Sequence, residues 1–180
     1  MMISAADASP PLDFSFRNLT VVEDLGGAKP RRGVKRYRKS ASGLYNCHSI
    51  RINNNQLMSI RGIYATIYQI VERPEQLTWL DLSFNKLTSL SAELVELSGL
   101  KIMYLHGNLL TELGKVLQTL KNLSQLYSLT LHGNPLEEHK KYRTRILSTL
   151  PQLRSLDFTN VTVSEKLHLK NKVKKTVSKT

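Results

Sequence analysis

Several residue types are scarce in this 180-residue chain, and each shortage excludes a class of protein. One cysteine cannot form a disulfide framework or a cysteine-based zinc site, so we expect an intracellular protein. Nine glycines and six prolines exclude collagen-like and low-complexity chains, whereas 41% apolar residues suffice for one domain. The most apolar stretch, residues 62–71, is about half the length that a bilayer span needs, and the start lacks a signal-peptide pattern. We therefore expect neither membrane contact nor secretion.

Acidic residues are also few, with 14 against 26 basic ones and a net charge of +12. The net charge is +4 over residues 1–46, +3 over 47–163 and +5 over 164–180. An acidic partner should therefore meet the two ends of the chain first. Enzyme signatures such as the P-loop, G-x-G-x-x-G, H-E-x-x-H and G-x-S-x-G are missing, so we expect no catalytic residues and no cofactor.

What the chain does contain is a repeat. The segments LTWLDLSFNKL, LKIMYLHGNLL and LYSLTLHGNPL, at residues 77–87, 100–110 and 126–136, fit L-x-x-L-x-L-x-x-N-x-L when a methionine replaces one leucine. Weaker copies lie at residues 47–57, where Cys47 replaces the first leucine as a small buried residue, and at 153–163, where Val161 replaces the asparagine. The pattern resembles the leucine-rich repeat, with three full matches in succession.

The resemblance implies an α/β fold, a right-handed curved solenoid of about five units over residues 47–163. Each L-x-L segment predicts a short parallel strand on the concave face, with helices on the convex face. Helical spacing from Ile60 to Val71 predicts one of these helices, and the segment 135–163 predicts a C-terminal cap with a helix that ends at Pro151. The repeated asparagines should have a structural role, because their amides can pair buried backbone groups; they are Asn55, Asn85, Asn108 and Asn134.

The cap resembles that of short, helix-backed members of the family that include phosphatase-regulatory and axonemal dynein light-chain proteins. Three further strings narrow the resemblance to small cytoplasmic interaction proteins: PPLDFSFRNL at residues 10–19, TWLDLSFNKLTSL at 78–90 and SLTLHGNPLEEHKKYR at 128–143. This implies a non-enzymatic adaptor or structural subunit, with the ciliary or flagellar axoneme as one setting.

Equivalent strand positions of successive units should form columns on the concave face. Aromatic and apolar residues concentrate in the middle units, and such residues dominate protein interfaces. The candidate partner-binding residues are Trp79, Ile102, Tyr104, His106, Tyr127 and His132. An alternative is that the N-terminal segment covers Trp79 through Leu12, Phe14 and Phe16. His106 and His132 share a column but lack a third ligand, so no metal site is expected.

Both ends are candidate electrostatic tails. Residues 1–46 are expected to form an extension whose basic arm, residues 29–39, contains Arg31, Arg32, Lys35, Arg36, Arg38 and Lys39. This arm fits an acidic assembly such as axonemal microtubules, and it fits nucleic acid less well because it contains only one aromatic, Tyr37. The alternative function is a nuclear or ribonucleoprotein-associated component held by the basic tails. In the tail 164–180, Ser164 is a candidate helix cap and Leu169, Val173 and Val177 form a narrow apolar stripe.

Overall fold

One sheet of stacked strands forms the body of the molecule. The computed structural model describes residues 9–33 and 35–177, and within them seven strands follow one another in chain order. The strands are β1 (Leu12–Asp13), β2 (Ser49–Arg51), β3 (Trp79–Asp81), β4 (Ile102–Tyr104), β5 (Ser128–Thr130), β6 (Ser155–Leu156) and β7 (Thr159–Asn160). Strands β1 to β6 are parallel, and β7 is antiparallel to β6. The result is the expected right-handed curved α/β solenoid.

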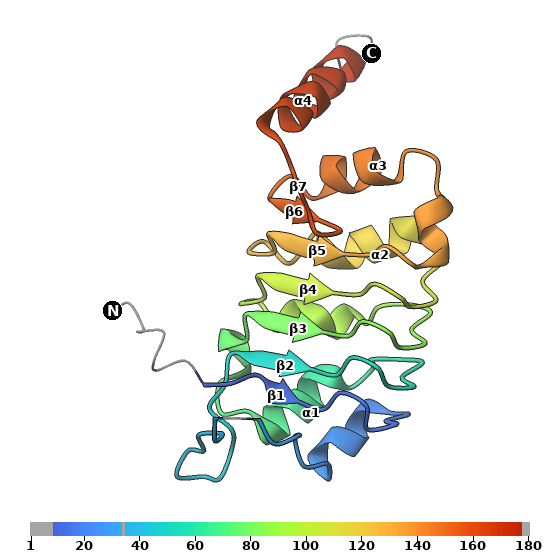
Figure 1. Cartoon of the computed structure of the whole chain (residues 1–180). Coiled ribbons are helices and arrows are strands. Elements are labelled where there is room, and N and C mark those ends of the chain that lie inside the picture. Colours follow the sequence, from blue (N-terminus) through green and yellow to red (C-terminus); the bar gives the residue numbers. More distant parts are fainter. Residues whose placement is uncertain (1–8, 34, 178–180) are drawn as a thin grey trace.

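The return segments pack behind the sheet (Figure 1). The α-helices are α1 (Ile63–Ile70), α2 (Leu113–Leu120), α3 (Tyr142–Thr149) and α4 (Val163–Val177). Single 3-10 turns are η1 (Val22–Gly26), η2 (Pro74–Gln76), η3 (Ala92–Glu96) and η4 (Pro135–Glu138). Helices α1 and α3 lie where the spacing predicted them. The return after β3 is only the 3-10 turn η3, because the unit that starts at residue 77 is the shortest of the repeat. The central side chains of β2 to β5 are fully buried; they are Ile50, Leu80, Met103 and Leu129.

The solenoid begins earlier than residue 47. Leu12 and Phe14 are fully buried, and the Phe14 N–H donates to the Arg51 carbonyl, so β1 adds a rung in front of β2. This rung covers the edge and the apolar end that β2 would otherwise expose to solvent. Part of the expected extension is therefore a terminal unit of the domain.

The other end closes with a hairpin. Asp157 and Phe158 both have positive φ, at 53° and 60°, as a two-residue type I′ turn requires. The chain therefore reverses after β6, and β7 pairs antiparallel with it where a seventh parallel strand would start. After the hairpin, α4 is capped by Thr162, where Ser164 had been expected: the Glu165 N–H donates to Thr162 Oγ1 and the Thr162 N–H donates to a Glu165 oxygen. The side chains of Val173 and Val177, the first eight residues and the last three lie outside the described structure.

The four repeated asparagines form a buried ladder. Asn108 Nδ2 donates to the carbonyls of Leu82 and Leu105, one in the preceding unit and one in its own, at 3.0 and 2.9 Å. Its Oδ1 accepts from the Leu87 N–H at 3.0 Å. Asn55, Asn85 and Asn134 repeat this pattern, so most of these carbonyls are shared by two amides.

Candidate functional site

Aromatic side chains gather on the concave face of the middle units. Trp79 on β3 and Tyr104 on β4 are half-buried, and their ring centroids lie 5.8 Å apart in an edge-to-face arrangement. Ile102 lies beside Trp79 in the strand register and is also half-buried. The sheet thus brings these three predicted residues together.

The two histidines of the next column are stacked. His106 and His132 have centroids 4.8 Å apart and an interplanar angle of 4°. Each ring has an Nδ1 partner: Thr130 Oγ1 lies 2.7 Å from His106, and Asp157 Oδ1 lies 3.3 Å from His132. Burial and, secondarily, the neighbouring His132 lower the pKa of His106. Within residues 9–33 and 35–177, no group of three metal-ligating side chains accompanies this pair.

Two phenylalanines that the sequence analysis missed complete the cluster. Phe84 lies edge-on to His106 with centroids 5.0 Å apart, and Phe158 contacts Tyr104, His106 and His132 at 5.4 to 5.6 Å. They are 54% and 62% exposed. We call these six rings the aromatic cluster: Trp79, Phe84, Tyr104, His106, His132 and Phe158.

A left-handed backbone conformation presents both phenylalanines. Phe84 has φ of 51° and immediately precedes the ladder residue Asn85, a position that glycine occupies in the next two units. A Cβ on Gly107 would lie 2.7 Å from the Phe84 ring, so the glycine leaves room for that ring to lie over the neighbouring unit. For Phe84, the signal in the sequence was a bulky residue in a column that otherwise holds glycine or asparagine.

Tyr127 lies apart from these contacts. It is 37% exposed, and its ring faces the Arg154 guanidinium at 5.8 Å. The N-terminal segment does not cover Trp79 in the described structure, because Leu12 and Phe14 lie in the core and Phe16 lies under Arg31. The aromatic cluster is therefore open to solvent.

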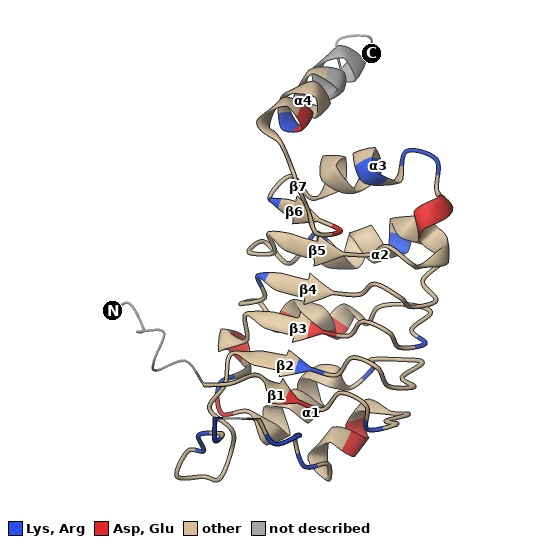
Figure 2. Ribbon diagram, viewed as in Figure 1, with Lys and Arg blue, Asp and Glu red and all other residues tan. Residues whose placement is uncertain are grey.

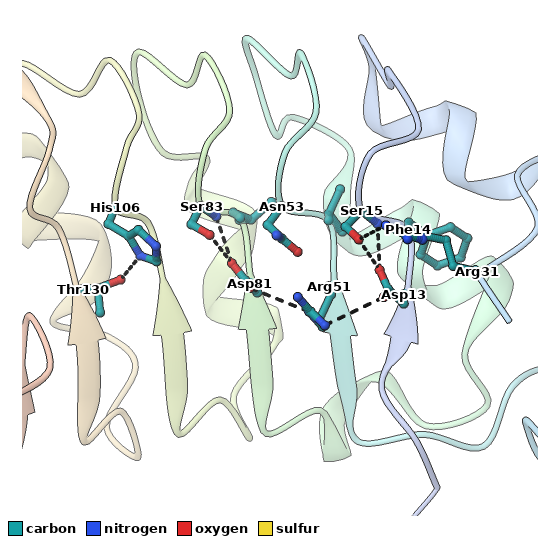
Figure 3. Close-up of polar contacts among 12 residues, drawn as sticks. Asp13, Phe14, Ser15, Arg31, Arg51, Asn53, Asp81, Ser83, His106 and Thr130 are labelled. Carbon is teal, nitrogen blue, oxygen red and sulfur yellow. Dashed lines mark hydrogen bonds and ion pairs between the residues drawn. The ribbon is translucent and has the colours of Figure 1, made fainter. Parts of the chain in front are cut away.

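A polar strip occupies the concave face of the first units (Figure 3). Arg51 lies between Asp13 and Asp81, with nitrogen to oxygen distances of 3.8 and 4.0 Å. Asp81 also accepts from the Ser83 N–H and hydroxyl, and Asp13 accepts from the same groups of Ser15. The concave face is thus divided into a charged, hydrogen-bonded part and an aromatic part.

The basic arm folds against the first unit. The Arg31 N–H donates to the Asp13 carbonyl, and its guanidinium donates to the Ser15 hydroxyl at 3.2 Å. Lys39 lies 4.5 Å from the Tyr45 ring centroid, a cation–π contact. The other lysines and arginines of the arm are also exposed, and the arm and Tyr45 line a hollow of about 590 Å³; these other residues are Lys29, Arg32, Lys35, Arg36 and Arg38. Figure 2 shows the concentration of basic residues at this end of the molecule.

Among the described residues, no helix has both the length and the apolar character needed to cross a membrane.

Comparison with known proteins agrees with this architecture. A family model described as leucine-rich repeat matches residues 71–180. The chain is 45% identical to leucine-rich repeat-containing protein 51 of Macaca mulatta over 157 residues, which span 87% of this chain and 81% of that protein.

Two solved structures share the fold at low sequence identity. A chain of the Drosophila melanogaster SNF/U2A' complex is 18% identical with a TM-score of 0.61, over 90% of this chain and 99% of that one. The Mex67 domain from Chaetomium thermophilum is 23% identical with a TM-score of 0.51, over 61% of this chain and 78% of that one. Repeat, sheet, asparagine ladder and relatives agree, and this protein belongs to the leucine-rich repeat family.

Proposed function

We propose that this protein is a non-enzymatic interaction module that binds another protein on its concave face, through the aromatic cluster. The observation that carries the proposal is the set of six rings in mutual contact, two of them more than half exposed. Tyr and Trp are typical interface anchors, because they bury a large area with little loss of side-chain entropy. The indole Nε1 of Trp79 is also buried without a hydrogen-bond partner among the described residues, and an unpaired buried donor costs free energy in this conformation.

The basic arm would supply long-range attraction to an acidic partner. Its exposed cations adjoin the polar strip, and exposed charges govern the rate of encounter more than the lifetime of a complex. We propose an acidic cytoplasmic assembly as the partner, with axonemal microtubules as the first candidate. The net charge of +12 supports this choice of chemistry.

Site-specific photocrosslinking tests which face is used. A benzophenone side chain would replace Tyr104 on the concave face or, as the matched control, Tyr68 on α1, which is 63% exposed. In a ciliated cell the Tyr104 position should give discrete protein adducts that the Tyr68 position does not. Adducts from the Tyr68 position alone would overturn the assignment of the concave face.

Sedimentation with stabilised microtubules tests the candidate partner. The full chain should co-sediment in a salt-dependent manner, since screening acts over about 8 Å at physiological ionic strength. In binding kinetics on the same microtubules, neutralising Arg32, Lys35 and Arg36 should lower the association rate, whereas Trp79→Ala should raise the dissociation rate. If the full chain stays in the supernatant at low salt, microtubules are not the partner.

The second candidate is a ribonucleoprotein-associated role, favoured by the exposed cations of the arm and by the fold shared with a chain of the SNF/U2A' complex. Crosslinking to RNA in cells distinguishes the two. RNA adducts confined to residues 29–39, with no protein adducts from the Tyr104 position, would favour this alternative.

A further inference from the structure

The chain places cations on several of its surface rings, and these rings lie outside the aromatic cluster. Three rings each lie 4.5 to 5.8 Å from a lysine or arginine of the chain; the pairs are Arg31 with Phe16, Lys39 with Tyr45, and Arg154 with Tyr127. The six rings of the cluster contact one another instead, at centroid distances of 4.8 to 6.0 Å. The exposed rings of Phe84 and Phe158 are therefore available to a cation from another molecule.

Carboxylates flank the aromatic cluster, one on β3 and one in the turn after β6. Asp81 lies opposite Tyr104 in the register of β3 and β4, and Asp157 Oδ1 lies 3.3 Å from His132 Nδ1. Burial and, secondarily, the negative charge of Asp81 raise the pKa of Tyr104. Both carboxylates also act on His106, where they oppose the lowering of its pKa by burial and by His132. The surroundings of the rings are thus negative.

These negative charges are only partly compensated within the chain. Arg51 lies between Asp13 and Asp81, so that one guanidinium serves two carboxylates (Figure 3). Asp157 accepts hydrogen bonds from the Tyr142 hydroxyl and from backbone N–H groups, which carry no net charge. The concave face is therefore locally acidic beside the aromatic cluster, although the whole chain has a net charge of +12.

We propose that the aromatic cluster binds a positively charged side chain of the partner, arginine in preference to lysine. A cation is attracted to the negative face of an aromatic ring, and nearby carboxylates add to this attraction. The planar guanidinium stacks on ring faces and is more weakly hydrated than an ammonium group. This inference rests on the function proposed for the concave face and adds the type of side chain that enters it. The acidic surface proposed for the basic arm and this arginine would be separate parts of one partner.

Fluorescence anisotropy with labelled peptides tests the preference on the full chain. The probe is a short peptide in which arginines alternate with glycine and serine. In the comparison peptides, lysine or citrulline replaces every arginine; citrulline has nearly the shape of arginine but no charge. The arginine peptide should bind saturably, more tightly than the lysine peptide and much more tightly than the citrulline peptide. Because the net charge of +12 repels a basic peptide, non-specific attraction would not produce this order.

Matched phenylalanine variants locate the binding. Phe158→Ala should weaken binding of the arginine peptide by about fivefold or more, because a contact between ring and cation is lost. The control is Phe16→Ala, which should bind as the wild type does. Phe16 has the same left-handed backbone conformation as Phe158 and a similar exposed fraction, 64% against 62%, but it lies outside the aromatic cluster. Asp157→Asn retains an oxygen for the backbone N–H groups and should also weaken binding of the arginine peptide, because it removes a negative charge.

Trp79 gives a second measurement that needs no variant. It is the single tryptophan of the chain and belongs to the aromatic cluster, so its fluorescence should change over the same range of arginine-peptide concentration as the anisotropy does. Unchanged Trp79 emission at saturation would place the peptide elsewhere and overturn the inference.

The inference also fails if the arginine peptide shows no saturable binding, or if the lysine or citrulline peptide binds as tightly. Equal losses in Phe158→Ala and Phe16→Ala, with circular dichroism spectra that match the wild type, would overturn it as well. Discrete photocrosslinked adducts at the Tyr104 position, obtained together with any of these results, would leave the proposed function in place and remove the arginine preference alone.

Discussion

Replacing the four ladder asparagines by alanine, one at a time, should destabilise the fold by unequal amounts. In the middle of the ladder a carbonyl that loses one amide keeps another: without Asn108, Leu82 O still accepts from Asn85 and Leu105 O still accepts from Asn134. Only the Leu87 N–H loses its partner. One buried unpaired backbone group costs about 1 to 3 kcal/mol, which is the expected loss for Asn108→Ala.

At the two ends of the ladder, the outermost carbonyl accepts from one asparagine amide and not from two. Asn134→Ala leaves the Leu110 N–H and the Leu131 carbonyl without the hydrogen bonds that the structure gives them, and both residues are fully buried. Asn55→Ala does the same to the Leu19 N–H and the Phe14 carbonyl, and it also removes the acceptor of the partly buried Arg17 N–H. With at least two unpaired buried groups, each terminal variant should lose roughly twice as much free energy of unfolding as Asn108→Ala, about 2 to 6 kcal/mol.

Equilibrium urea denaturation followed by circular dichroism measures these differences. The control is Asn122→Ala at an exposed turn, which should change the free energy of unfolding by no more than about 0.5 kcal/mol. If Asn108→Ala costs as much as Asn134→Ala, the neighbouring amides do not compensate for each other and the reasoning fails. If it costs no more than the exposed control, the ladder does not contribute to stability.

Three further predictions follow from titratable groups. Because the pKa of His106 is lowered in the folded protein, its contribution to stability should be complete above about pH 6.5 and should decline as the pH falls toward the lower folded pKa. His106→Gln should flatten this part of a plot of unfolding free energy against pH, and an unchanged slope would contradict the prediction. Hydrogen bonds from Arg143 lower the pKa of Glu165 to about 2, so the attachment of α4 should hold above the usual glutamate pKa and weaken as the pH falls toward 2. Arg143→Leu should speed hydrogen exchange of the α4 amides at neutral pH, and exchange as slow as in the wild type would refute this. Burial raises the pKa of Cys47 to about 11, so a thiol reagent at pH 8 should label it only as fast as the protein unfolds, and rapid labelling of the folded protein would show that Cys47 is accessible.

Much of the architecture could be predicted from the sequence because it depends on local, repeated patterns. Alternating leucines specify which side chains of a strand point inward, and an asparagine three residues after the second strand leucine marks the ladder. Helical spacing located α1, because a one-sided apolar stripe packs only against a core. The leucines and the asparagine recur in successive units, so each copy of the pattern supported the interpretation of the others as leucine-rich repeats.

The terminal units were harder to predict because they depart from the repeat. The first rung, at Leu12, lacks the asparagine and is separated from β2 by 35 residues, so only its pairing with β2 shows that it belongs to the sheet. The hairpin at Asp157 depends on two positive φ angles, which no leucine pattern records. Both are properties of a chain end that must cover an exposed sheet edge.

The sequence by itself therefore determined the repeat, the inward residues and the basic character of both ends. Only the tertiary structure decided which side chains meet. Phe84 reaches His106 and Phe158 reaches Tyr104 because successive strands stack about 4.8 Å apart and the left-handed turns project these rings over their neighbours. The start of α4 likewise lies beside the cap because Arg143 donates a hydrogen bond to Glu165, a contact between residues 22 positions apart. Such contacts depend on how the units stack and on where the chain turns back, and the spacing of residues within a single repeat carries no record of either.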